Sequence, residues 1–463
     1  MTETAERIRQ KMADKGVMNS ATLAFLRAYQ LIASGSKGEV PEEEIGPSRS
    51  VVNYESLKAV SEFEADLLAK TVVIKLNGGL GTSMGLEKVK SLLEVRPGVA
   101  FLDLMARQIL SLRAATRGDV RFLLMNSNAS SDDTLDYLRK SVPELGDPAD
   151  LELLQNWVPK LEQETLEAVS HPANPDLEWC PPGHADVYPS LEGSGWLDRL
   201  LEDDVKYAFI SNSDNLGAVL DPTLLSYFAH GEAPFLMEVT RRTESDKKGG
   251  HLATRKSDER LLLRELAQCP EADLESFQDI NRHQFFNTNN IWVNLKKLKQ
   301  VMAKTGGVLE LPVIRNGKTV DPRDSSTTPV YQLEQAMGSA IECFEGSAAV
   351  NVPRSRFAPV KGTSDLFALR SDAYEVGDDG RVQLVASRGG KPPVVRFSSE
   401  YKLVDALAGL GQPSLLEAEE LSVSGPVTFA EGVVIKGKVA VINASDETKI
   451  IPSGLYTDQV ITL

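Results

Sequence analysis

The chain has 463 residues, more than one hydrophobic core usually serves, so we expect two or three domains. Hydrophobic residues make up 42% of the chain and charged residues 25%, as in ordinary globular proteins. The formal net charge of −16 argues against a nucleic acid or an anionic membrane as a partner.

The cysteines and the N-terminus indicate the compartment. Cys180, Cys269 and Cys343 lie far apart and form no C-x-x-C pair, so neither a disulfide framework nor a zinc site is indicated. The first residues, MTETAERIRQKMADKG, are polar and charged, and no run of about 18 apolar residues follows elsewhere. We therefore expect a cytoplasmic protein that does not enter a membrane.

Residues 1–50 read as a small helical segment followed by a linker. The stretches RIRQKMADKG and SATLAFLRAYQLIASG place apolar residues at steps of three and four. Ser20 is the expected N-cap of the second helix, and Gly35 is its expected stop. The polar sequence GEVPEEEIGP then ends the helical pattern.

A short strand and a glycine-rich loop follow in residues 71–85. The run from Thr71 to Leu76 is apolar and β-branched, as expected of a buried strand. The loop after it has few Cβ atoms, so its backbone N–H groups can approach a phosphate closely; its members are Asn77, Gly78, Gly79, Gly81 and Gly85. The alternative is a tight strand-to-helix turn with no ligand.

Two nucleotide-binding patterns fit this loop only loosely. The spacing of Gly79, Gly81 and Gly85 resembles the dinucleotide fingerprint, which also needs an immediate helix and an acidic residue about 20 positions later. The Walker pattern fails because no Gly-Lys-Ser/Thr closes the run. Two lysines follow instead, Lys88 and Lys90, and either could neutralise a triphosphate.

Strands and helices alternate from about residue 56. We predict a helix over residues 101–115, a strand over 120–127 and a helix with a capped start over 131–140. This order is typical of a mostly parallel sheet with helices on both faces.

Residues 179–184, Trp-Cys-Pro-Pro-Gly-His, predict a shaped loop because two prolines fix φ and remove two donors. Gly183 would let another group approach the backbone, and His184 could donate to a sugar hydroxyl or a phosphate. The alternative interpretation of this segment is a proline-rich turn whose histidine lies on the surface.

Residues 206–216, KYAFISNSDNL, predict a strand that ends in polar residues. Ligands bind outside the carboxyl ends of strands in open α/β sheets, so Asp214 is a candidate Mg²⁺ ligand. Ser-x-Asp-Asn is also a common turn and capping sequence.

Three later segments carry further polar groups. Residues 235–239 predict a strand, and residues 286–292 contain amides that could bind hydroxyls or simply form a turn. Residues 352–366 carry three cations, including Lys361, around two prolines that would stiffen the chain, although such clusters are often solvated. After residue 376, short β-branched pieces recur about every six residues, which suggests a parallel β-helix.

These motifs, taken together, resemble the UTP–glucose-1-phosphate uridylyltransferase family of the eukaryotic type. The matching segments are KLNGGLGTSMG with SLLEVR, MNSNASSDDT, W-x-P-P-G-H, SNSDNLGA, KGG, ELAQ, FNTNNIW and VPRSRFAPVK. Two departures stand out. Glu87-Lys88-Val89-Lys90 stands where the family usually has Lys-Gly-Pro-Lys. Cys180 stands where the family usually has a tyrosine, at the second position of W-x-P-P-G-H.

The resemblance assigns roles to individual residues. Lys361 and Lys90 would be catalytic, with Lys88 a rival to Lys90, and Asp214 would hold Mg²⁺. The resemblance places the UTP contacts at Leu76, Asn77, Gly78, Gly79, Lys90, Gln155, Gly183, Asp214 and Lys361. It places the sugar-phosphate contacts at His184, Asn212, Gly250, Glu265, Asn287 and Asn289.

The resemblance also implies a fold and a reaction. We expect a Rossmann-like nucleotidyltransferase domain with a mixed, mostly parallel sheet over residues 51–375, after a helical segment over 1–50 and before a left-handed β-helix over 376–463. UTP and glucose 1-phosphate would give UDP-glucose and pyrophosphate with Mg²⁺. The C-terminal domain could carry a homo-oligomer interface.

Three alternatives remain open at this point. The first is a pyrophosphorylase of broader specificity that accepts N-acetylhexosamine 1-phosphates. The second is a nicotinamide-dependent oxidoreductase that uses the loop of Gly79 to Gly85. The third is a nucleotide-sugar binder without activity, which would be expected to lack a lysine or aspartate that this chain has.

Overall fold

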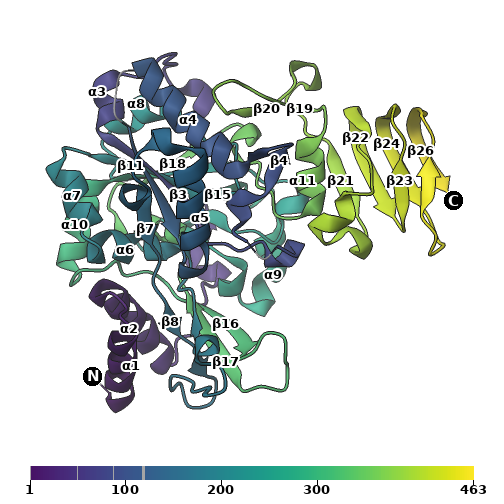
Figure 1. The fold of residues 1–463 in the computed structure, drawn as a ribbon. Coiled ribbons are helices and arrows are strands. Elements are labelled where there is room, and N and C mark those ends of the chain that lie inside the picture. The colour runs from purple at the N-terminus through teal and green to yellow at the C-terminus, as the bar shows by residue number, and fades with distance from the viewer. Residues whose placement is uncertain (1, 50, 87, 117–119) are drawn as a thin grey trace.

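The computed structural model describes residues 2–49, 51–86, 88–116 and 120–463. Glu87, one of the residues at which the sequence departs from the family pattern, lies outside this described part. Figure 1 shows an α/β body that contains the N-terminus and a group of strands at the C-terminal end. None of the helices in the described ranges has the length and apolar character needed to cross a membrane.

A mixed sheet forms the centre of the body. Its strand order is β2-β18-β12-β15-β11-β3-β6-β7, and all neighbours pair in parallel except β15, which is antiparallel to β11 and β12. The prediction of a mixed, mostly parallel sheet is confirmed. The strands are β2 (Val52–Asn53), β18 (Ala348–Asn351), β12 (Phe235–Arg241), β15 (Phe285–Asn294), β11 (Tyr207–Asn212), β3 (Thr71–Asn77), β6 (Arg121–Asn126) and β7 (Glu152–Leu154).

Strand β3 shows why helices must cover both faces of this sheet. All of its residues are buried, and successive side chains point to opposite faces. Val72 and Ile74 belong to one apolar core, and Val73 belongs to another. The first core includes α6 (Val187–Gly193), α7 (Trp196–Glu202) and α10 (Leu295–Lys304), and the second includes α4 (Phe101–Thr116) and α8 (Pro222–His230). Figure 1 shows helices on both sides of the central strands.

Several predicted elements are present with shifted ends. The predicted helix over residues 101–115 is α4, and the predicted strand over 120–127 is β6. The helix predicted over 131–140 is α5 (Asn128–Ser141), which begins earlier because Ser127 forms a capping box with Ser130. The strand predicted over 206–216 ends at Asn212, and its polar continuation is a loop.

The N-terminal segment forms helices α1 (Glu3–Asp14) and α2 (Asn19–Ala33). The prediction that Ser20 caps the second helix is wrong, because Met18 is the N-cap and the Ser20 hydroxyl donates to the Pro189 carbonyl at 2.6 Å. Gly35 follows the helix with a φ of +87°, as expected of a stop. Further along, β1 (Ile45–Pro47) joins the central sheet by pairing with β13 (His251–Arg255).

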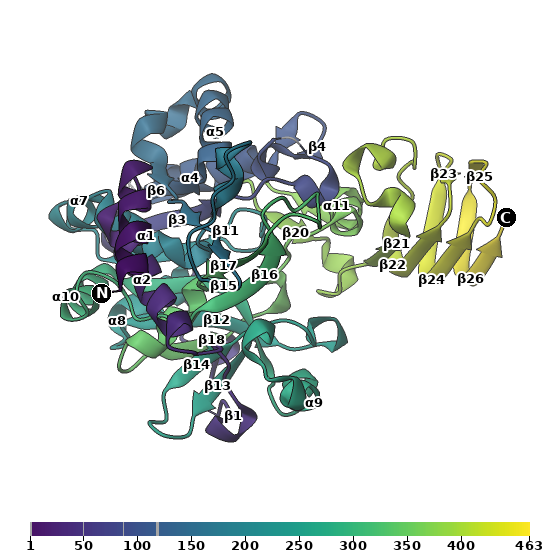
Figure 2. The same cartoon turned by 90° about the horizontal axis from the view of Figure 1, so that it is seen from below.

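The C-terminal strands pair in parallel in two small sheets. One contains β21 (Val394–Phe397), β22 (Ser414–Ser424), β24 (Val433–Ile442) and β26 (Gly454–Thr462), and the other contains β23 (Val427–Phe429) and β25 (Lys449–Ile451). Figure 2 shows the first four strands side by side. Their apolar core is continuous with residues next to the predicted site, including Met84, Leu216 and Val360.

Candidate active site

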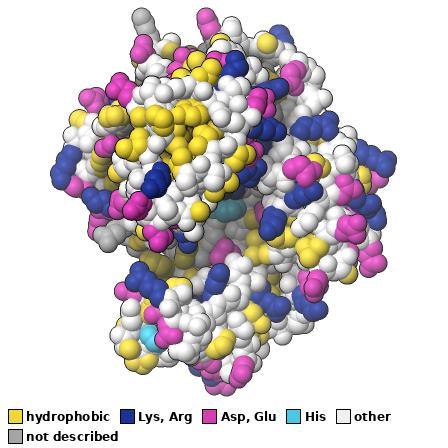
Figure 3. Space-filling model, turned by 90° about the vertical axis from the view of Figure 1, so that its right-hand side faces the viewer, with side chains coloured by type: hydrophobic (Ala, Val, Ile, Leu, Met, Phe, Trp, Pro, Cys, Tyr) yellow, Lys and Arg dark blue, Asp and Glu magenta, His cyan; other side chains and the backbone are white. Residues whose placement is uncertain are grey.

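The predicted site lies where the carboxyl ends of β3, β6 and β11 meet. These strands are parallel, so the segments that follow them emerge at one edge of the sheet. Strand β15 runs in the opposite direction and therefore brings its first residues, including Asn287, to the same edge, where Asn287 pairs with Val239. Figure 3 shows the molecule from the side of the C-terminal strands, with a hollow edged by Lys and Arg side chains.

The glycine-rich loop after β3 folds back on itself. Leu80 and Val89 form a β-bridge, and the Lys90 amide donates to the Gly79 carbonyl at 3.2 Å. A Cβ on Gly79 would meet no atom within 4 Å, so this part of the loop is open to a ligand. Gly85 has a φ of +78°, which explains one glycine of the motif.

Asn77 belongs to the scaffold of the loop through its side chain. Its amide nitrogen donates to the Asn126 side chain at 2.8 Å and to the Thr134 hydroxyl at 3.1 Å, and the residue is buried. The side-chain nitrogen is therefore committed to the scaffold, whereas Asn77 Oδ1 is buried without a hydrogen-bond partner among the described residues. The backbone carbonyl of Asn77 accepts a bond from the Ser130 hydroxyl at 2.8 Å.

The structure brings Lys90 and Asp214 together, whereas Lys88 is exposed. The Lys90 Nζ lies 2.9 Å from Asp214 Oδ2, and both side chains are mostly buried. Asp214 Oδ1 is also buried and has no hydrogen-bond partner in the described part of the chain. The helix that follows, α8, takes its cap from Asp221, whose carboxylate accepts from the Leu224 amide. Asp214 is thus free of the capping role that its sequence context suggested.

Gln155 connects two loops that the sequence predicts to bind the nucleotide. Its Nε2 donates to the Gly183 carbonyl at 3.1 Å, and its Oε1 lies 2.8 Å from where a Cβ on Gly78 would be. The backbone amide of Gln155 donates to the Asn126 carbonyl at the end of β6. Gly78, Gln155 and Gly183 therefore form one continuous surface beside the glycine loop.

Backbone groups of a distant segment hold the Pro-Pro-Gly-His loop. Gly183 has a φ of +86°, and a Cβ there would lie 2.6 Å from the Gln335 carbonyl oxygen. The Gln335 amide donates to the Pro182 carbonyl at 3.0 Å, and the Gln335 carbonyl accepts from the Ala185 amide at 3.1 Å. No motif in the sequence points to Gln335, which lies about 150 residues downstream.

His184 is held as a neutral donor. Its Nδ1 accepts a bond from the Met337 amide at 2.9 Å, so Nε2 carries the proton of the neutral ring. Burial among protein atoms lowers the pKa of His184 to about 4, so the imidazole is uncharged at neutral pH. The sequence predicted a donor at this position, and the Met337 contact explains which nitrogen donates.

The predicted sugar contacts form a second group across the site. A Cβ on Gly250 would lie 2.5 Å from Glu265 Oε2, so the carboxylate packs directly on that glycine. Asn287 Nδ2 donates to Asn289 Oδ1 at 2.8 Å, and Asn289 has a φ of +58° in the bulged start of β15. Burial raises the pKa of Glu265, while the charge of Lys361 opposes that shift.

The segment before Lys361 is tied to the Asp214 loop. Pro359 forms a β-bridge with Asn215, and the Val360 amide donates to the Asp214 carbonyl at 3.0 Å. The Lys361 side chain is exposed, and its Nζ lies 5.9 Å from the centre of the Phe357 ring. Lys361 forms no ion pair with the described residues, so its ammonium group can bind an anion. Asn212, the last residue of β11, is half-buried at the start of the same loop.

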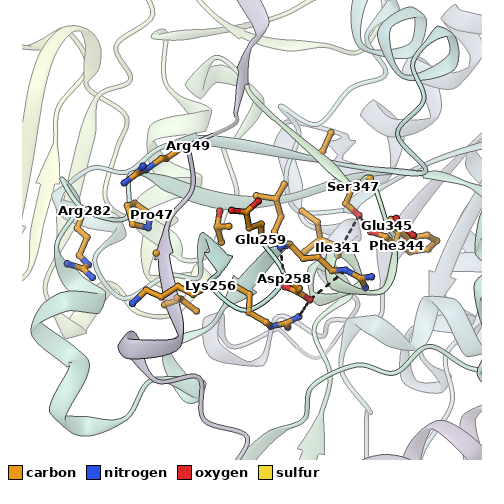
Figure 4. Close-up of a pocket in the computed structure, with 18 residues that line it drawn as sticks. Pro47, Arg49, Lys256, Asp258, Glu259, Arg282, Ile341, Phe344, Glu345 and Ser347 are labelled. Atoms are coloured by element: carbon orange, nitrogen blue, oxygen red, sulfur yellow. Dashed lines mark hydrogen bonds and ion pairs between the residues drawn. The ribbon is translucent and has the colours of Figure 1, made fainter.

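A large groove lies elsewhere, and none of the predicted site residues lines it. This groove of about 1050 Å³ lies between β1, the turn after β13 and the segment before β18, as Figure 4 shows. Three of the cations that line it already have anionic partners: Arg255 pairs with Asp258 and Glu342, Arg260 with Asp258, and Arg282 with Glu42. We therefore do not assign the predicted chemistry to this groove.

Comparison with known proteins agrees with the motifs that meet at the sheet edge. The family model described as UTP–glucose-1-phosphate uridylyltransferase matches residues 23–436. The protein of that name from Solanum tuberosum is 40% identical over 427 residues, which cover 90% of this chain and 86% of the relative.

Solved structures give the same result for the fold. A mutant UDP-glucose pyrophosphorylase from Leishmania major in complex with UDP-Glc is 45% identical, with a TM-score of 0.95 over 100% of both chains. A UDP-glucose phosphorylase from Trypanosoma brucei is 47% identical, with a TM-score of 0.90 over 100% of both chains. The chain belongs to the UTP–glucose-1-phosphate uridylyltransferase family.

Proposed function

We propose that this protein joins UTP and glucose 1-phosphate to give UDP-glucose and pyrophosphate, in a reversible reaction. The observation that carries the proposal is the meeting of Lys90, Asp214 and the Lys361 segment beside the open glycine loop. Family membership supports the same reaction. An anionic nucleotide needs this local positive charge because the chain as a whole carries −16.

The reaction needs no general base. A sugar phosphate has its second pKa near about 6 and is mostly a dianion at neutral pH. One of its oxygens attacks the α-phosphorus of UTP, the bond to the β-phosphate oxygen breaks, and pyrophosphate leaves with the electron pair. Positioning and charge neutralisation therefore carry the catalysis. Lys361 would neutralise the attacking phosphate and the α-phosphate, and Lys90 the triphosphate.

We assign the remaining UTP contacts to the surface around the glycine loop. Gln155 and Gly183 would contact the uracil, and the backbone from Leu76 to Gly79 would support the nucleotide. The continuity of Gly78, Gln155 and Gly183 supports this placement. Lys90 is favoured over Lys88 because only Lys90 contacts Asp214 in the described part of the chain.

Asp214 is the residue that would hold Mg²⁺. The fit rests on Asp214 Oδ1, a buried carboxylate oxygen without a partner among the described residues. Those residues contain no cluster of three or more His, Cys, Asp or Glu side chains suited to a metal. A single carboxylate suits Mg²⁺, which usually takes one or two carboxylates together with substrate phosphates and water. Bound there, Mg²⁺ would neutralise charge on the phosphates.

The sugar side of the site would be formed by the second group of polar residues. Glu265, Asn287 and Asn289 present acceptors and donors for hydroxyls, and Gly250 allows close approach. His184 would donate through Nε2 to the sugar phosphate, and Asn212 would lie beside it. No described contact separates glucose from an N-acetylated sugar, so substrate choice needs a direct assay.

The oxidoreductase alternative is not supported by the loop after β3. A dinucleotide fingerprint leads directly into a helix whose N-terminus binds the pyrophosphate. Here Thr82–Met84 and Lys90–Leu92 are single short turns, and the next α-helix begins at Phe101. That alternative also gives no role to the pairing of Lys90 with Asp214.

The test is pyrophosphate release from UTP with the 1-phosphates of glucose, galactose and N-acetylglucosamine. We expect a clear preference for glucose 1-phosphate. Equal or faster turnover of N-acetylglucosamine 1-phosphate would contradict the assignment of glucose 1-phosphate as the substrate. Absence of pyrophosphate release with all three would contradict the proposed function.

The remaining features of the chain stay predictions. We propose domains over residues 1–50, 51–375 and 376–463, with the parallel C-terminal strands wound as a left-handed β-helix. Among the described strands β26 pairs with β24 alone, and it exposes Leu455 and Val460, so a homo-oligomer interface would be expected there. Three free cysteines fit a cytoplasmic location.

A further inference from the structure

A buried ion pair lies directly beneath the proposed site. Glu238 of β12 accepts two bonds from Arg356, each at 2.7 Å, and neither residue is appreciably exposed. Asn290 and the Trp292 indole of β15 donate to the same carboxylate at 3.0 and 2.9 Å. The carboxylate of Glu238 is thus fully occupied, and it fixes Arg356 rigidly against the sheet.

Asn215 joins this cluster to the segment that leads to Lys361. Its Nδ2 donates to the Arg356 carbonyl at 3.0 Å and to Asn290 Oδ1 at 3.3 Å. Its Oδ1 accepts from the Ala358 amide at 3.0 Å. Since Asn215 is only 2% exposed, these bonds are shielded from water.

The Asp214 loop itself is also held from below. The Lys75 ammonium of β3 donates to the Ser211 hydroxyl at 2.8 Å and to the Ala218 carbonyl at 2.5 Å, so it contacts both ends of this loop. Arg356 donates to the Val219 carbonyl at 3.0 Å. Asn215, between these two anchors, adds side-chain bonds to the neighbouring segment over residues 356–360, which the Val360 amide also joins to the Asp214 carbonyl.

We infer that Asn215 is a positioning residue that fixes Lys361 relative to Asp214. The inference rests on the proposed function. It adds Asn215, a residue to which the sequence analysis assigns no role. Asn215 touches no substrate in this proposal. Its bonds fix the backbone of residues 356–358. Because Lys361 follows only three residues later, the position of this backbone determines where the lysine lies.

Apart from the Asn215 bonds, the chain around Lys361 is held by backbone contacts, among them the bond from the Val360 amide to the Asp214 carbonyl. The Lys361 side chain is exposed, and its backbone amide donates to Asp365 Oδ2 at 2.8 Å on the side of the following helix, α11 (Thr363–Arg370). A misplacement of about 1 Å in a reacting group can cost on the order of a hundredfold in rate. Loss of Asn215 should therefore affect turnover more than nucleotide binding, which depends on the glycine loop.

The test compares Asn215→Ala with a matched control, Asn443→Ala. Asn443 is equally buried and makes the same kinds of bond: Nδ2 donates to the Pro426 and Glu447 carbonyls, and Oδ1 accepts from the Ser445 amide. It lies among the C-terminal strands, away from the site. We expect both variants to lower the melting temperature similarly, whereas only Asn215→Ala loses about ten- to a hundredfold in kcat.

The KM for UTP should stay within about threefold in Asn215→Ala, because the glycine loop is untouched. Asn215→Ser, whose hydroxyl is too short to bridge both partners, should change kcat in the same direction. Equal kcat values for Asn215→Ala and Asn443→Ala would overturn the inference. So would failure of both Asn215 variants to fold while Asn443→Ala folds, because Asn215 would then be a folding residue.

A double variant tests whether Asn215 acts through Lys361. If it does, Asn215→Ala should slow the Lys361→Gln enzyme by no more than about twofold, since the lysine to be positioned is gone. Multiplicative losses would show independent action and contradict the inference. The unaltered enzyme is measured in parallel: absence of pyrophosphate release there would instead contradict the proposed function, which keeps the two failures distinct.

Discussion

At the scale of single residues, the proposed chemistry depends most on Lys361. The lysine would stabilise charge that is greatest while the phosphoryl group is in transit, so it should act on turnover. Loss of such a donor costs about 3 to 4 kcal/mol in the transition state. We predict that Lys361→Gln folds and binds UTP but loses at least about a hundredfold in kcat.

Circular dichroism, UTP titration and pyrophosphate release on one preparation would check this prediction. Lys88→Gln is the matched control, because Lys88 is also an exposed lysine and follows the glycine-rich loop. Its kcat should stay close to that of the unaltered enzyme. An unchanged kcat in folded Lys361→Gln would remove Lys361 from the site.

Asp214→Asn should separate a metal ligand from a structural carboxylate. The amide keeps the shape but removes the negative charge that pairs with Lys90 and that Mg²⁺ would require. We expect a folded protein whose activity falls by on the order of a hundredfold or more. Pyrophosphate release measured over a range of Mg²⁺ concentrations is the test. Near-normal turnover at limiting Mg²⁺ would show that Asp214 holds no metal.

His184 gives a prediction about stability and pH. In the folded chain its pKa is lowered to about 4, whereas in the unfolded chain the value is about 6.5. Between these values only the unfolded chain takes up the proton, so stability falls as the pH drops below about 6.5, by about 1.4 kcal/mol per pH unit. Above about 6.5 the ring is neutral in both states and contributes no pH dependence.

His184→Gln removes this titration. Between pH 7 and pH 5, unfolding free energies from urea titrations should therefore fall by about 2 kcal/mol more in the unaltered protein than in the variant. His251, whose pKa burial also lowers, is present in both proteins, so its contribution cancels in the comparison. Parallel pH curves would mean that His184 protonates normally in the folded state.

At the scale of elements, the loop over residues 181–184 depends on contact with a distant segment. Gly183 has a φ of +86° and a ψ of 173°, a combination that essentially only glycine adopts, and a Cβ there would lie 2.6 Å from the Gln335 carbonyl oxygen, so Gly183→Ala should displace the loop. We expect its KM for UTP to rise by about tenfold or more, since about 1.4 kcal/mol of lost contact is a factor of ten. UTP titration and initial rates would measure the effect.

Gly146→Ala is the control for this glycine. Gly146 has a φ of +119° and a ψ of −168°, in the same region of backbone conformation as Gly183, but a Cβ there would meet no atom within 4 Å. Both variants therefore place an alanine in a region that essentially only glycine adopts, at a cost of about 1 to 3 kcal/mol. Only Gly183→Ala should alter nucleotide binding. Equal KM values for the two variants would show that Gly183 matters for its conformation and not for its neighbours.

The elements that the sequence predicted well are those that form because of the pattern of residues close to one another in the chain. The apolar run of β3 and the spacing of α4 depend on neighbouring residues, and both lie where the pattern indicated. Helix starts were predicted less well. Ser20 was a plausible cap, but its hydroxyl bonds to Pro189 instead, and a contact over 169 positions leaves no local signal.

The site divides in the same way. Asp214 stood out because it follows an apolar strand, and Lys361 because it lies in a cationic segment stiffened by two prolines. What the sequence could not predict was how they meet: the direction of β15, the pairing of Lys90 with Asp214, and the Gln335 and Met337 contacts that hold residues 183–184. These pairings and contacts join residues about 80 to 150 positions apart, so their cause lies in the assembled fold.

At the scale of the whole molecule, the C-terminal strands support the catalytic segments. Leu216 and Val360, next to the Asp214 loop and Lys361, share an apolar core with Leu415 and Val433 of the C-terminal part. The Thr363 hydroxyl also donates to the Tyr401 carbonyl at 2.6 Å. A boundary after residue 375 therefore divides a continuous core, and the two parts should not unfold independently.

We predict a single unfolding transition for the full chain in calorimetry, with pyrophosphate-releasing activity lost at the same temperature. Leu410→Ala provides the perturbation, because Leu410 is fully buried in the C-terminal part and far in sequence from Lys361. The substitution should cost about 2 to 5 kcal/mol and shift the whole transition to lower temperature. If the C-terminal part were separately stable, Leu410→Ala would instead split the calorimetric peak and leave activity in place above the first transition. That result would contradict the shared core and would assign the support of Lys361 to the central sheet alone.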